Sequence, residues 1–184
     1  MSIGGYKIRN QMEIHFLSFA VVEWADVFTR KQYRDIVVNS LEFCQENKGL
    51  NLHAWCIMSN HIHLLVSSRT GNLSGTIRDF KSFTYKEIIK AIEENKQESR
   101  RTWLLEIFKK AGELNLRNSH YQFWRKDNQP KEIFSRQFTI NKLGYIHNNP
   151  VEAGLVDKPH KYIYSSARDY YVTKRVGLLK IDFI

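Results

Sequence analysis

The stretch that decides the fold is LNLHAWCIMSNHIHLLVSS, residues 50–68. It holds two runs of apolar, aromatic and β-branched residues, and the pair Ser59 and Asn60 separates them. Runs of this kind predict strands, and a short polar break between them indicates a turn. We therefore expect strands over 50–60 and 61–68 that pair as a hairpin, with the Ser-Asn turn between them.

Two histidines, His61 and His63, lie at the start of the second of these strands. Side chains alternate between the two faces of a strand, so both imidazoles point one way while Ile62 and Leu64 point the other way. The two histidines are about 6 to 7 Å apart along the strand, which lets both rings hold one metal ion. We expect one face of this strand to belong to the core and the other to carry a pair of metal ligands.

Two other interpretations of the histidine pair stay open. Both rings can face solvent, or one can be a core imidazole that is hydrogen-bonded to a backbone carbonyl. Two ligands also do not complete a metal site. His53, on the neighbouring strand, is either a further ligand or a structural residue.

The segments around the hairpin predict further strands and helices. Residues 13–22 are apolar and β-branched and predict a first strand. Helical spacing of apolar residues predicts one helix in each of the segments 26–49, 74–95, 103–114 and 138–149. Gly49 suits the position just past the end of the first helix, and Asn72 or Ser74 can cap the second. An extended segment with a turn is expected over 120–130 and a loop-rich tail over 151–170.

The order β-α-β-β-α predicts the fold class. It is typical of an α+β sandwich in which an antiparallel sheet has helices packed on one face, here with additional C-terminal helices. A chain of 184 residues fits one domain, which we place over 1–184 with its core at 6–156 and a C-terminal tail at 157–184.

Composition limits the classes of function. Hydrophobic residues make up 42% of the chain, which is enough for a core, and the formal charge of +9 points to a polyanionic partner without identifying it. The two cysteines, Cys44 and Cys56, form no CxxC pair, so we expect buried thiols in a reducing compartment. The sequence has no run of about 20 apolar residues and no secretory signal, so we expect a cytoplasmic protein without a membrane span.

A second candidate for chemistry is KLGYIHNNPVEAGLV, residues 142–156. Tyr145 and Asn149 are four residues apart and share a face if this segment is helical. Asn149 precedes Pro150, which disfavours helical backbone at Asn149, so the helix is expected to end there. The alternative is that Tyr145 is a core aromatic and the segment an ordinary helix end.

These motifs together resemble one family. IMSNHIHLLV, residues 57–66, is similar to the His-hydrophobic-His signature of the HUH single-tyrosine transposases, which include the IS200-like transposases. YIHNNPVEAGLV, residues 145–156, resembles the catalytic-helix motif of their REP-associated branch, as do YQFW at 121–124 and YSSARDY at 164–170. The resemblance spans roughly residues 6–171.

The resemblance implies a ferredoxin-like or RRM-like sheet, a divalent metal, Mg²⁺ or Mn²⁺, and a tyrosine nucleophile. His61 and His63 match the metal ligands, Tyr145 matches the nucleophile, and Asn149 matches the third ligand four residues later. In related transposases the third ligand is often Gln or His, so Asn149 departs from the pattern. The implied reaction is cleavage and rejoining of single-stranded DNA with hairpins through a 5′-phosphotyrosine, by a monomer or a homodimer.

Cations and aromatics suggest DNA contacts, because cations follow phosphates and aromatics stack on bases. We expect these contacts at Arg78, Lys81, Lys86, Trp124, Arg125 and Lys126. The alternative is that the lysines lie on a solvated helix face and that Trp124 belongs to the core.

Two other functions compete with the transposase. One is a nucleic-acid-binding module on the same fold that has lost its catalysis. The other is a metallohydrolase in which His61 and His63 bind metal and Tyr145 takes no part. The sequence contains no obvious general base for Tyr145.

Overall fold

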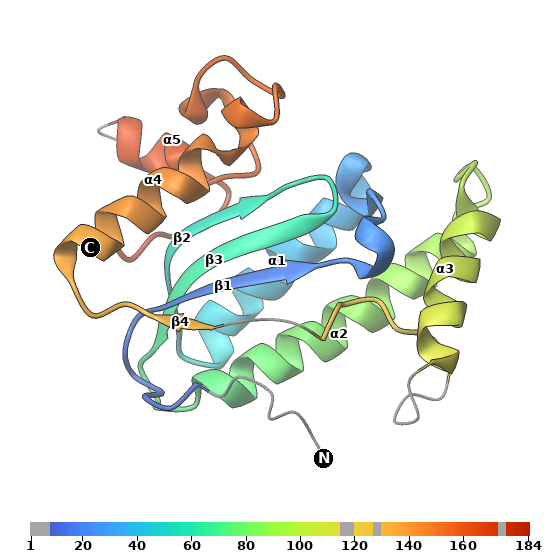
Figure 1. Ribbon diagram of the computed structural model, residues 1–184, viewed down its shortest axis with the longest axis horizontal. Helices are drawn as coiled ribbons and strands as arrows, with labels where there is room; N and C mark the ends of the chain where they lie inside the picture. Colours follow the sequence, from blue (N-terminus) through green and yellow to red (C-terminus); the bar gives the residue numbers. More distant parts are fainter. Residues whose placement is uncertain (1–7, 115–119, 127–129, 173–175) are drawn as a thin grey trace.

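The structure is a computed structural model, and it describes residues 8–114, 120–126, 130–172 and 176–184. Its centre is an antiparallel sheet (Figure 1), whose strands are β1 (His15–Ala20), β2 (Leu50–Ile57), β3 (His61–Ser68) and β4 (Lys131–Glu132). The helices are α1 (Lys31–Asn47), α2 (Leu73–Glu94), α3 (Arg101–Glu113), α4 (Arg136–Glu152) and α5 (Ala167–Tyr171).

The sheet has the strand order β2-β3-β1-β4, and every pair is antiparallel. Strands β2 and β3 form the expected hairpin, and β3 then pairs with β1 so that His61 faces Ala20 and His63 faces Ser18. With α1 following β1 and α2 following β3, this is the ferredoxin-like arrangement. The predicted α+β class is confirmed, and β4 is a short strand that the sequence did not indicate.

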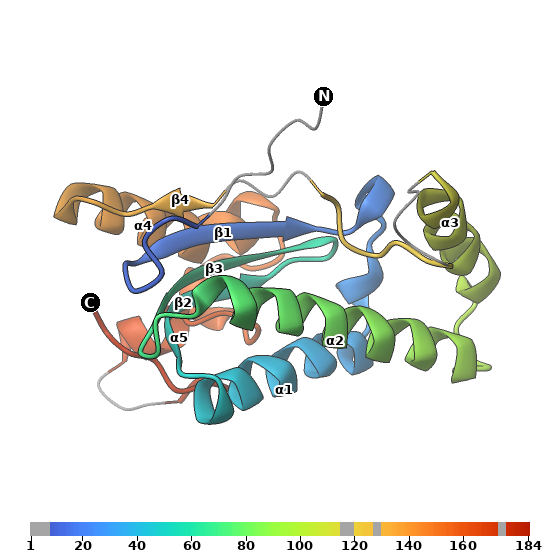
Figure 2. The same ribbon diagram turned by 90° about the horizontal axis from the view of Figure 1, so that it is seen from below.

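Helices α1 and α2 lie side by side on one face of the sheet (Figure 2). The alternate residues of β3 that face them are Ile62, Leu64 and Val66, each fully buried. They join Leu17 and Phe19 of β1 in the larger of two hydrophobic clusters. Burial of this apolar area is the main stabilising contribution to the fold.

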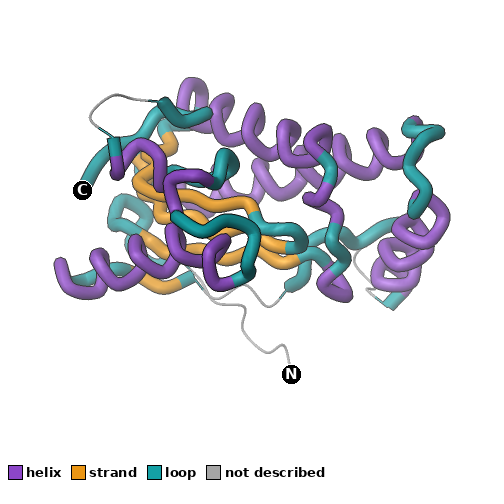
Figure 3. The backbone as a smooth tube through the Cα atoms, turned by 90° about the horizontal axis from the view of Figure 1, so that it is seen from above, coloured by secondary structure: helices purple, strands orange, loops and turns teal. Residues whose placement is uncertain are grey.

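Helix α4 covers the opposite face, where it contacts β2 and β3. Figure 3 shows the strands as a band with helices on both sides. The cluster on this side is smaller and includes Phe16, Leu65 and Ile146. Helix α4 therefore lies across the sheet from the two core helices, whereas Tyr164, just before α5, joins the larger cluster and bonds to Asp35 of α1.

The start of the first helix differs from the prediction. Helix α1 begins at Lys31 rather than at 26, because residues 22–29 form two 3-10 turns, η1 (Val22–Trp24) and η2 (Val27–Thr29). Val27 and Phe28 are buried, so their apolar side chains serve the core from these turns and not from the helix. At the other end Gly49 has φ +69°, the left-handed conformation expected of a glycine just past a helix.

The end of helix α4 is the clearest correction. The sequence predicts a stop at Pro150, but the helix continues through this residue to Glu152. Pro150 lies in the last turn, where its missing N–H removes one hydrogen bond only, and the amide of Ala153 still donates to the carbonyl of Asn149 at 3.0 Å. Pro150 is also buried, so its ring adds apolar contact.

Helix α3 stands at one end of the sheet beside η1 (Figure 1). The connector from α2 carries Glu98, whose side chain is buried and bonded to Arg30, Arg100 and the hydroxyl of Tyr33. Arg100 also reaches Asp26 at 2.9 Å. This polar cluster ties the α2–α3 connector to the start of α1.

Candidate active site

His61 and His63 lie on the same face of β3, as the alternation along the strand predicts. Their ring centroids are 4.7 Å apart. His63 is only 3% exposed, and neither of its ring nitrogens has a hydrogen-bond partner. A buried polar side chain is nearly always hydrogen-bonded, so the free nitrogens of His63 make it a candidate ligand residue.

The charge state of His63 suits metal binding. Burial, followed by the charges of His61 and Lys142, lowers its pKa to about 3. The ring is therefore neutral at physiological pH, and a neutral imidazole offers a lone pair to a metal ion.

His61 is oriented by two asparagines. Its Nδ1–H donates to the side-chain oxygen of Asn60 at 2.7 Å. Burial lowers the pKa of His61, and a hydrogen bond with the side chain of Asn149 opposes this shift. A hydrogen-bond partner on Nδ1 fixes the tautomer and the orientation of the ring, as is usual for histidines in metal sites.

Helix α4 brings Tyr145 to the histidines. The Tyr145 ring lies 5.1 Å from the His63 ring and 5.9 Å from the Phe16 ring, between centroids. Ile146 and Pro150 of α4 are buried, and Ile146 packs against the same face of the sheet as its neighbour Tyr145, which holds this part of the helix over β3. Tyr145 is 42% exposed, which makes it accessible to a substrate and argues against a core aromatic.

Asn149 reaches the same site because α4 is continuous. Residues four apart share a helix face, and the helix that continues past Pro150 keeps Tyr145 and Asn149 in this relation. The contact of Asn149 with His61 and that of Tyr145 with His63 place all four side chains in one cluster.

Two other histidines do not join this cluster. His147 is buried and forms a hydrogen bond with the hydroxyl of Ser166 at 2.8 Å, on the other side of α4. His53 donates from Nδ1 to the carbonyl of Asp182 at 2.6 Å and pairs with the Ser67 hydroxyl. Both are structural, which settles the alternative left open for His53.

The donor set fits a divalent cation. Within the part of the chain that the structure describes, no third His, Cys, Asp or Glu completes a cluster with the histidine pair. Two asparagine amides lie against the pair: that of Asn60 is engaged with Nδ1 of His61, and that of Asn149 is the other. Two neutral imidazoles and one amide oxygen suit Mn²⁺ or Mg²⁺, with manganese favoured by the nitrogen ligands.

Lys142 is a further residue of this cluster that was not predicted from the sequence, although it lies three residues before Tyr145 and so on the same helix face. Its ammonium lies 5.2 Å from the Tyr145 ring centroid and 4.6 Å from the Phe16 ring centroid. Burial, and secondly the charge of Lys131, lowers the pKa of Lys142. A cation held against the tyrosine is placed to meet a phosphate.

The DNA contacts predicted on α2 lie on the other side of the sheet from Tyr145. Arg78 is bonded to Asp79, and Lys81 lies 5.1 Å from the Phe19 ring centroid. Lys86 is exposed on the same helix. These cations are not part of the active-site cluster, and their contact with DNA stays a prediction.

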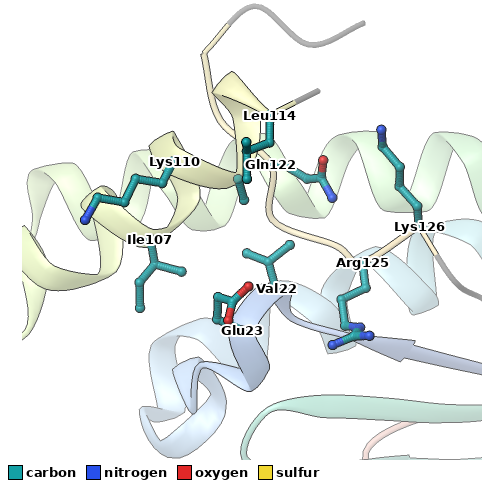
Figure 4. A pocket seen from close by; sticks show the side chains of 9 residues that line it. Val22, Glu23, Ile107, Lys110, Leu114, Gln122, Arg125 and Lys126 are labelled. Carbon is teal, nitrogen blue, oxygen red and sulfur yellow. The ribbon is translucent and has the colours of Figure 1, made fainter. Parts of the chain in front are cut away.

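The other predicted DNA contacts divide into core and surface. Trp124 is 6% exposed, and its indole N–H donates to the Thr84 hydroxyl at 3.2 Å. It packs against Phe28, which matches the core alternative and leaves no ring face for a base. Arg125 and Lys126 line a surface groove beside η1 (Figure 4).

The two cysteines are not candidate nucleophiles. Cys44 and Cys56 are free and buried, and burial raises their thiol pKa values to about 11 and about 12. Neither is therefore a thiolate nucleophile at physiological pH. Among the described helices, none is long and apolar enough to span a bilayer.

Comparison with protein-family models identifies the family. The model described as Transposase IS200 like matches residues 9–111, more than half of the chain. The protein belongs to this family. As an IS200-like transposase it is a DNA-binding enzyme of the transposase type. The matched span includes His61 and His63 but ends before α4, so the roles of Tyr145 and Asn149 rest on the geometry above.

Solved structures show the fold of this IS200-like transposase. A REP-associated tyrosine transposase bound to a REP hairpin superposes with a TM-score of 0.63 at 17% identity, over 99% of this chain and 92% of that one. A candidate transposase of Deinococcus radiodurans R1 matches with a TM-score of 0.44 and 17% identity, over 80% of this chain and 97% of that one. The second likeness is too weak to bear on the fold. No match is found among curated proteins.

Proposed function

We propose that this IS200-like transposase cuts and rejoins single-stranded, hairpin-containing DNA through a covalent bond to Tyr145. The observation that carries the proposal is the contact between Tyr145 and His63, which brings a half-exposed phenol to a buried imidazole with no partner. The two residues come from α4 and β3, which are far apart in the sequence and meet only in the folded protein.

The reaction is a phosphoryl transfer. The phenolate oxygen of Tyr145 attacks the scissile phosphorus, a Tyr–O–P bond forms at the 5′ end, and the P–O3′ bond breaks. The phenolic proton is released to solvent, and the departing 3′ oxygen takes up a proton to become a hydroxyl. Attack by a 3′ hydroxyl reverses the step, so strands are rejoined without a nucleotide cofactor. Lys142 offsets the negative charge that develops on the phosphate.

A divalent ion, Mg²⁺ or Mn²⁺, would be held by His61, His63 and Asn149. When bound, it polarises the scissile phosphate and neutralises developing charge. The chain prepares for it by keeping His63 neutral and by fixing the His61 ring through Asn60.

Three observations support the proposed substrate class and the REP-associated branch. The motifs at 145–156, 121–124 and 164–170 resemble that branch. The fold is similar along nearly the whole chain to a REP-associated tyrosine transposase bound to a REP hairpin. The formal charge of +9 favours a polyanion.

The geometry also favours catalysis within one chain. Tyr145 lies against the His63 of its own chain, so the cluster is complete without a second copy. A mixture of Tyr145→Phe and His63→Ala proteins should therefore form no adduct. Recovery of adduct in the mixture would show that the tyrosine acts on a partner's site.

The main test is a covalent-trapping experiment. The protein is mixed with a labelled library of single-stranded hairpin DNA and Mn²⁺ or Mg²⁺, and adducts are separated on a denaturing gel. We expect an adduct with wild type and none with Tyr145→Phe. Tyr171→Phe is the matched control, because Tyr171 is an exposed tyrosine on α5, and it should retain the adduct.

The other outcomes separate the competing functions. If DNA is cleaved without forming an adduct, and this cleavage persists in Tyr145→Phe, the protein is a metallohydrolase. Tight binding without cleavage in either metal would identify a binding module, with Asn149 as the first residue to replace by Gln. An adduct that persists in Tyr145→Phe would place the nucleophile elsewhere.

A further inference from the structure

The turn η1 carries an exposed aromatic ring to the edge of the histidine cluster. Trp24 is 52% exposed, and its ring centroid lies 5.9 Å from that of His61 with the planes at 80°. Trp24 therefore combines a wide apolar face open to solvent with a position beside a candidate metal ligand. The mechanism above does not use it.

The backbone holds this ring in place at a conformational cost. Glu23 and Trp24 have φ values of +53° and +52°, a region that L-residues other than glycine rarely adopt. Two hydrogen bonds fix the start of the turn. The amide of Val21 donates to the carbonyl of Asn60 and the amide of Val22 to the carbonyl of Phe123, each at 2.9 Å. Backbone strain of this kind is often found beside functional sites.

A cation and a groove continue from the tryptophan. The Arg125 guanidinium lies 5.3 Å from the Trp24 ring centroid. Arg125 also lines a groove of about 580 Å³ between η1 and α3, together with Lys110 and Lys126 (Figure 4). Glu23 is the acidic residue of this groove.

The groove has the mixed character that single-stranded nucleic acid requires. Its apolar lining comes from Val22, Ile107 and Leu114, and its cations outnumber its acidic group. Single strands bind where cations follow the phosphates and aromatic rings stack on the bases. Arg125 connects the groove to Trp24, so one strand can contact both.

We propose that Trp24 is the stacking platform for a base next to the scissile phosphate, and that the strand then runs past Arg125 into the groove between η1 and α3. Lys110 and Lys126 meet its phosphates there. The inference rests on the proposed function, because it takes the strand to be the substrate cut at the histidine cluster. It adds a binding subsite that neither the motifs nor the family match indicates.

The test uses binding, so that it does not depend on chemistry. Labelled hairpin oligonucleotides carry the fluorescent base 2-aminopurine at successive positions of the single-stranded flank, and the protein is the Tyr145→Phe form. We expect quenching at one flank position and its loss in Trp24→Asn, because Asn lacks the ring but tolerates positive φ. Binding should weaken about tenfold or more in Trp24→Asn, and Trp24→Tyr should restore both signals.

Phe83→Ala is the matched control, since Phe83 is an exposed aromatic on α2 away from the site, and it should leave quenching and affinity unchanged. Lys110→Gln and Lys126→Gln should each lower the salt dependence of binding by about one phosphate contact. Equal quenching in Trp24→Asn and its parent, or quenching at no position, would overturn the inference.

The failure of this inference is distinguishable from that of the proposed function. If hairpin DNA forms an adduct on wild type and Trp24→Asn binds as tightly as its parent, only the stacking subsite is wrong. If no adduct forms but the quenching depends on Trp24, the subsite stands and the chemistry is wrong.

Discussion

The two faces of strand β3 serve different purposes. Ile62, Leu64 and Val66 point into the large hydrophobic cluster under α1 and α2, where they are fully buried. His63 points the other way, into the small cluster under α4, and its nitrogens have no partner. One strand thus supports stability on one face and carries the candidate active site on the other.

Buried polar groups on the two sides of the sheet also differ in their hydrogen bonding. Glu98, in the connector beside the helix layer, is buried with hydrogen bonds to two arginines and a tyrosine. His63 is equally buried without any. An unsatisfied buried group costs free energy, so its retention next to an accessible tyrosine indicates a functional site.

The largest expected effect separates chemistry from stability. His63→Ala should reduce adduct formation by about a thousandfold, because the metal's charge contributes several kcal/mol to the transition state. The melting temperature should change little, since removal of an unpaired polar group offsets the packing lost with the ring. His120→Ala, at an exposed histidine, is the control. A large fall in stability with unchanged activity would reverse the assignment of the two faces.

The second prediction compares adjacent leucines of β3. Leu64→Ala, in the large cluster, should lower the free energy of unfolding by about 3 kcal/mol through lost burial and a cavity. Leu65→Ala is the same change at an equally buried residue of the small cluster, and we expect a smaller loss. Urea unfolding measures both. An equal or larger loss for Leu65→Ala would show that the α4 side contributes as much to stability.

The third prediction concerns Glu98. Burial alone would raise its pKa, but hydrogen bonds and charge from Arg100 outweigh burial, so the pKa lies below 4.5 in the folded protein. Its contribution is therefore full above about pH 4.5 and is lost as the pH falls below this value. Glu98→Gln should cost about 2 kcal/mol at pH 7 and flatten the acid limb of a stability profile. An unchanged acid limb would contradict this role.

A smaller effect is expected at Lys142. Lys142→Gln should slow adduct formation by about tenfold or more without changing the melting temperature, because it removes a positive charge from the site. Lys90→Gln on the outer surface of α2 is the control. Equal rates for the two variants would show that the cation next to Tyr145 has no part in the reaction.

The smallest expected effect tests the cations on the helix-layer side. If Lys86 contacts DNA, Lys86→Gln should lower affinity about twofold and reduce the salt slope of binding by roughly 0.7. Lys158→Gln, at an exposed lysine beyond α4, should leave the affinity and the salt slope unchanged. Identical slopes for Lys86→Gln and wild type would show that Lys86 does not contact DNA.

Local periodicity was enough for much of the fold. Strand alternation correctly placed His61 and His63 on one face and Ile62 and Leu64 on the other, since the period of a strand depends on its own backbone. The hairpin, the helix positions and the α+β class followed from the same kind of evidence. The helix end at Pro150 was predicted wrongly because a preference of the preceding residue is weaker than continued packing of the last turn.

Local patterns along the chain were therefore enough to predict most of the strands and helices, the facing of the histidines and the identity of the motifs at 57–66 and 145–156, but not β4 or the two 3-10 turns. The contact of Tyr145 with His63, the approach of Lys142, the burial of Trp124 and the position of Trp24 beside His61 depend on the tertiary structure. This division follows from the range of the interactions. Propensity and periodicity act over a few neighbouring residues, whereas these contacts depend on how β1, β3 and α4 pack, and packing is a property of the whole chain.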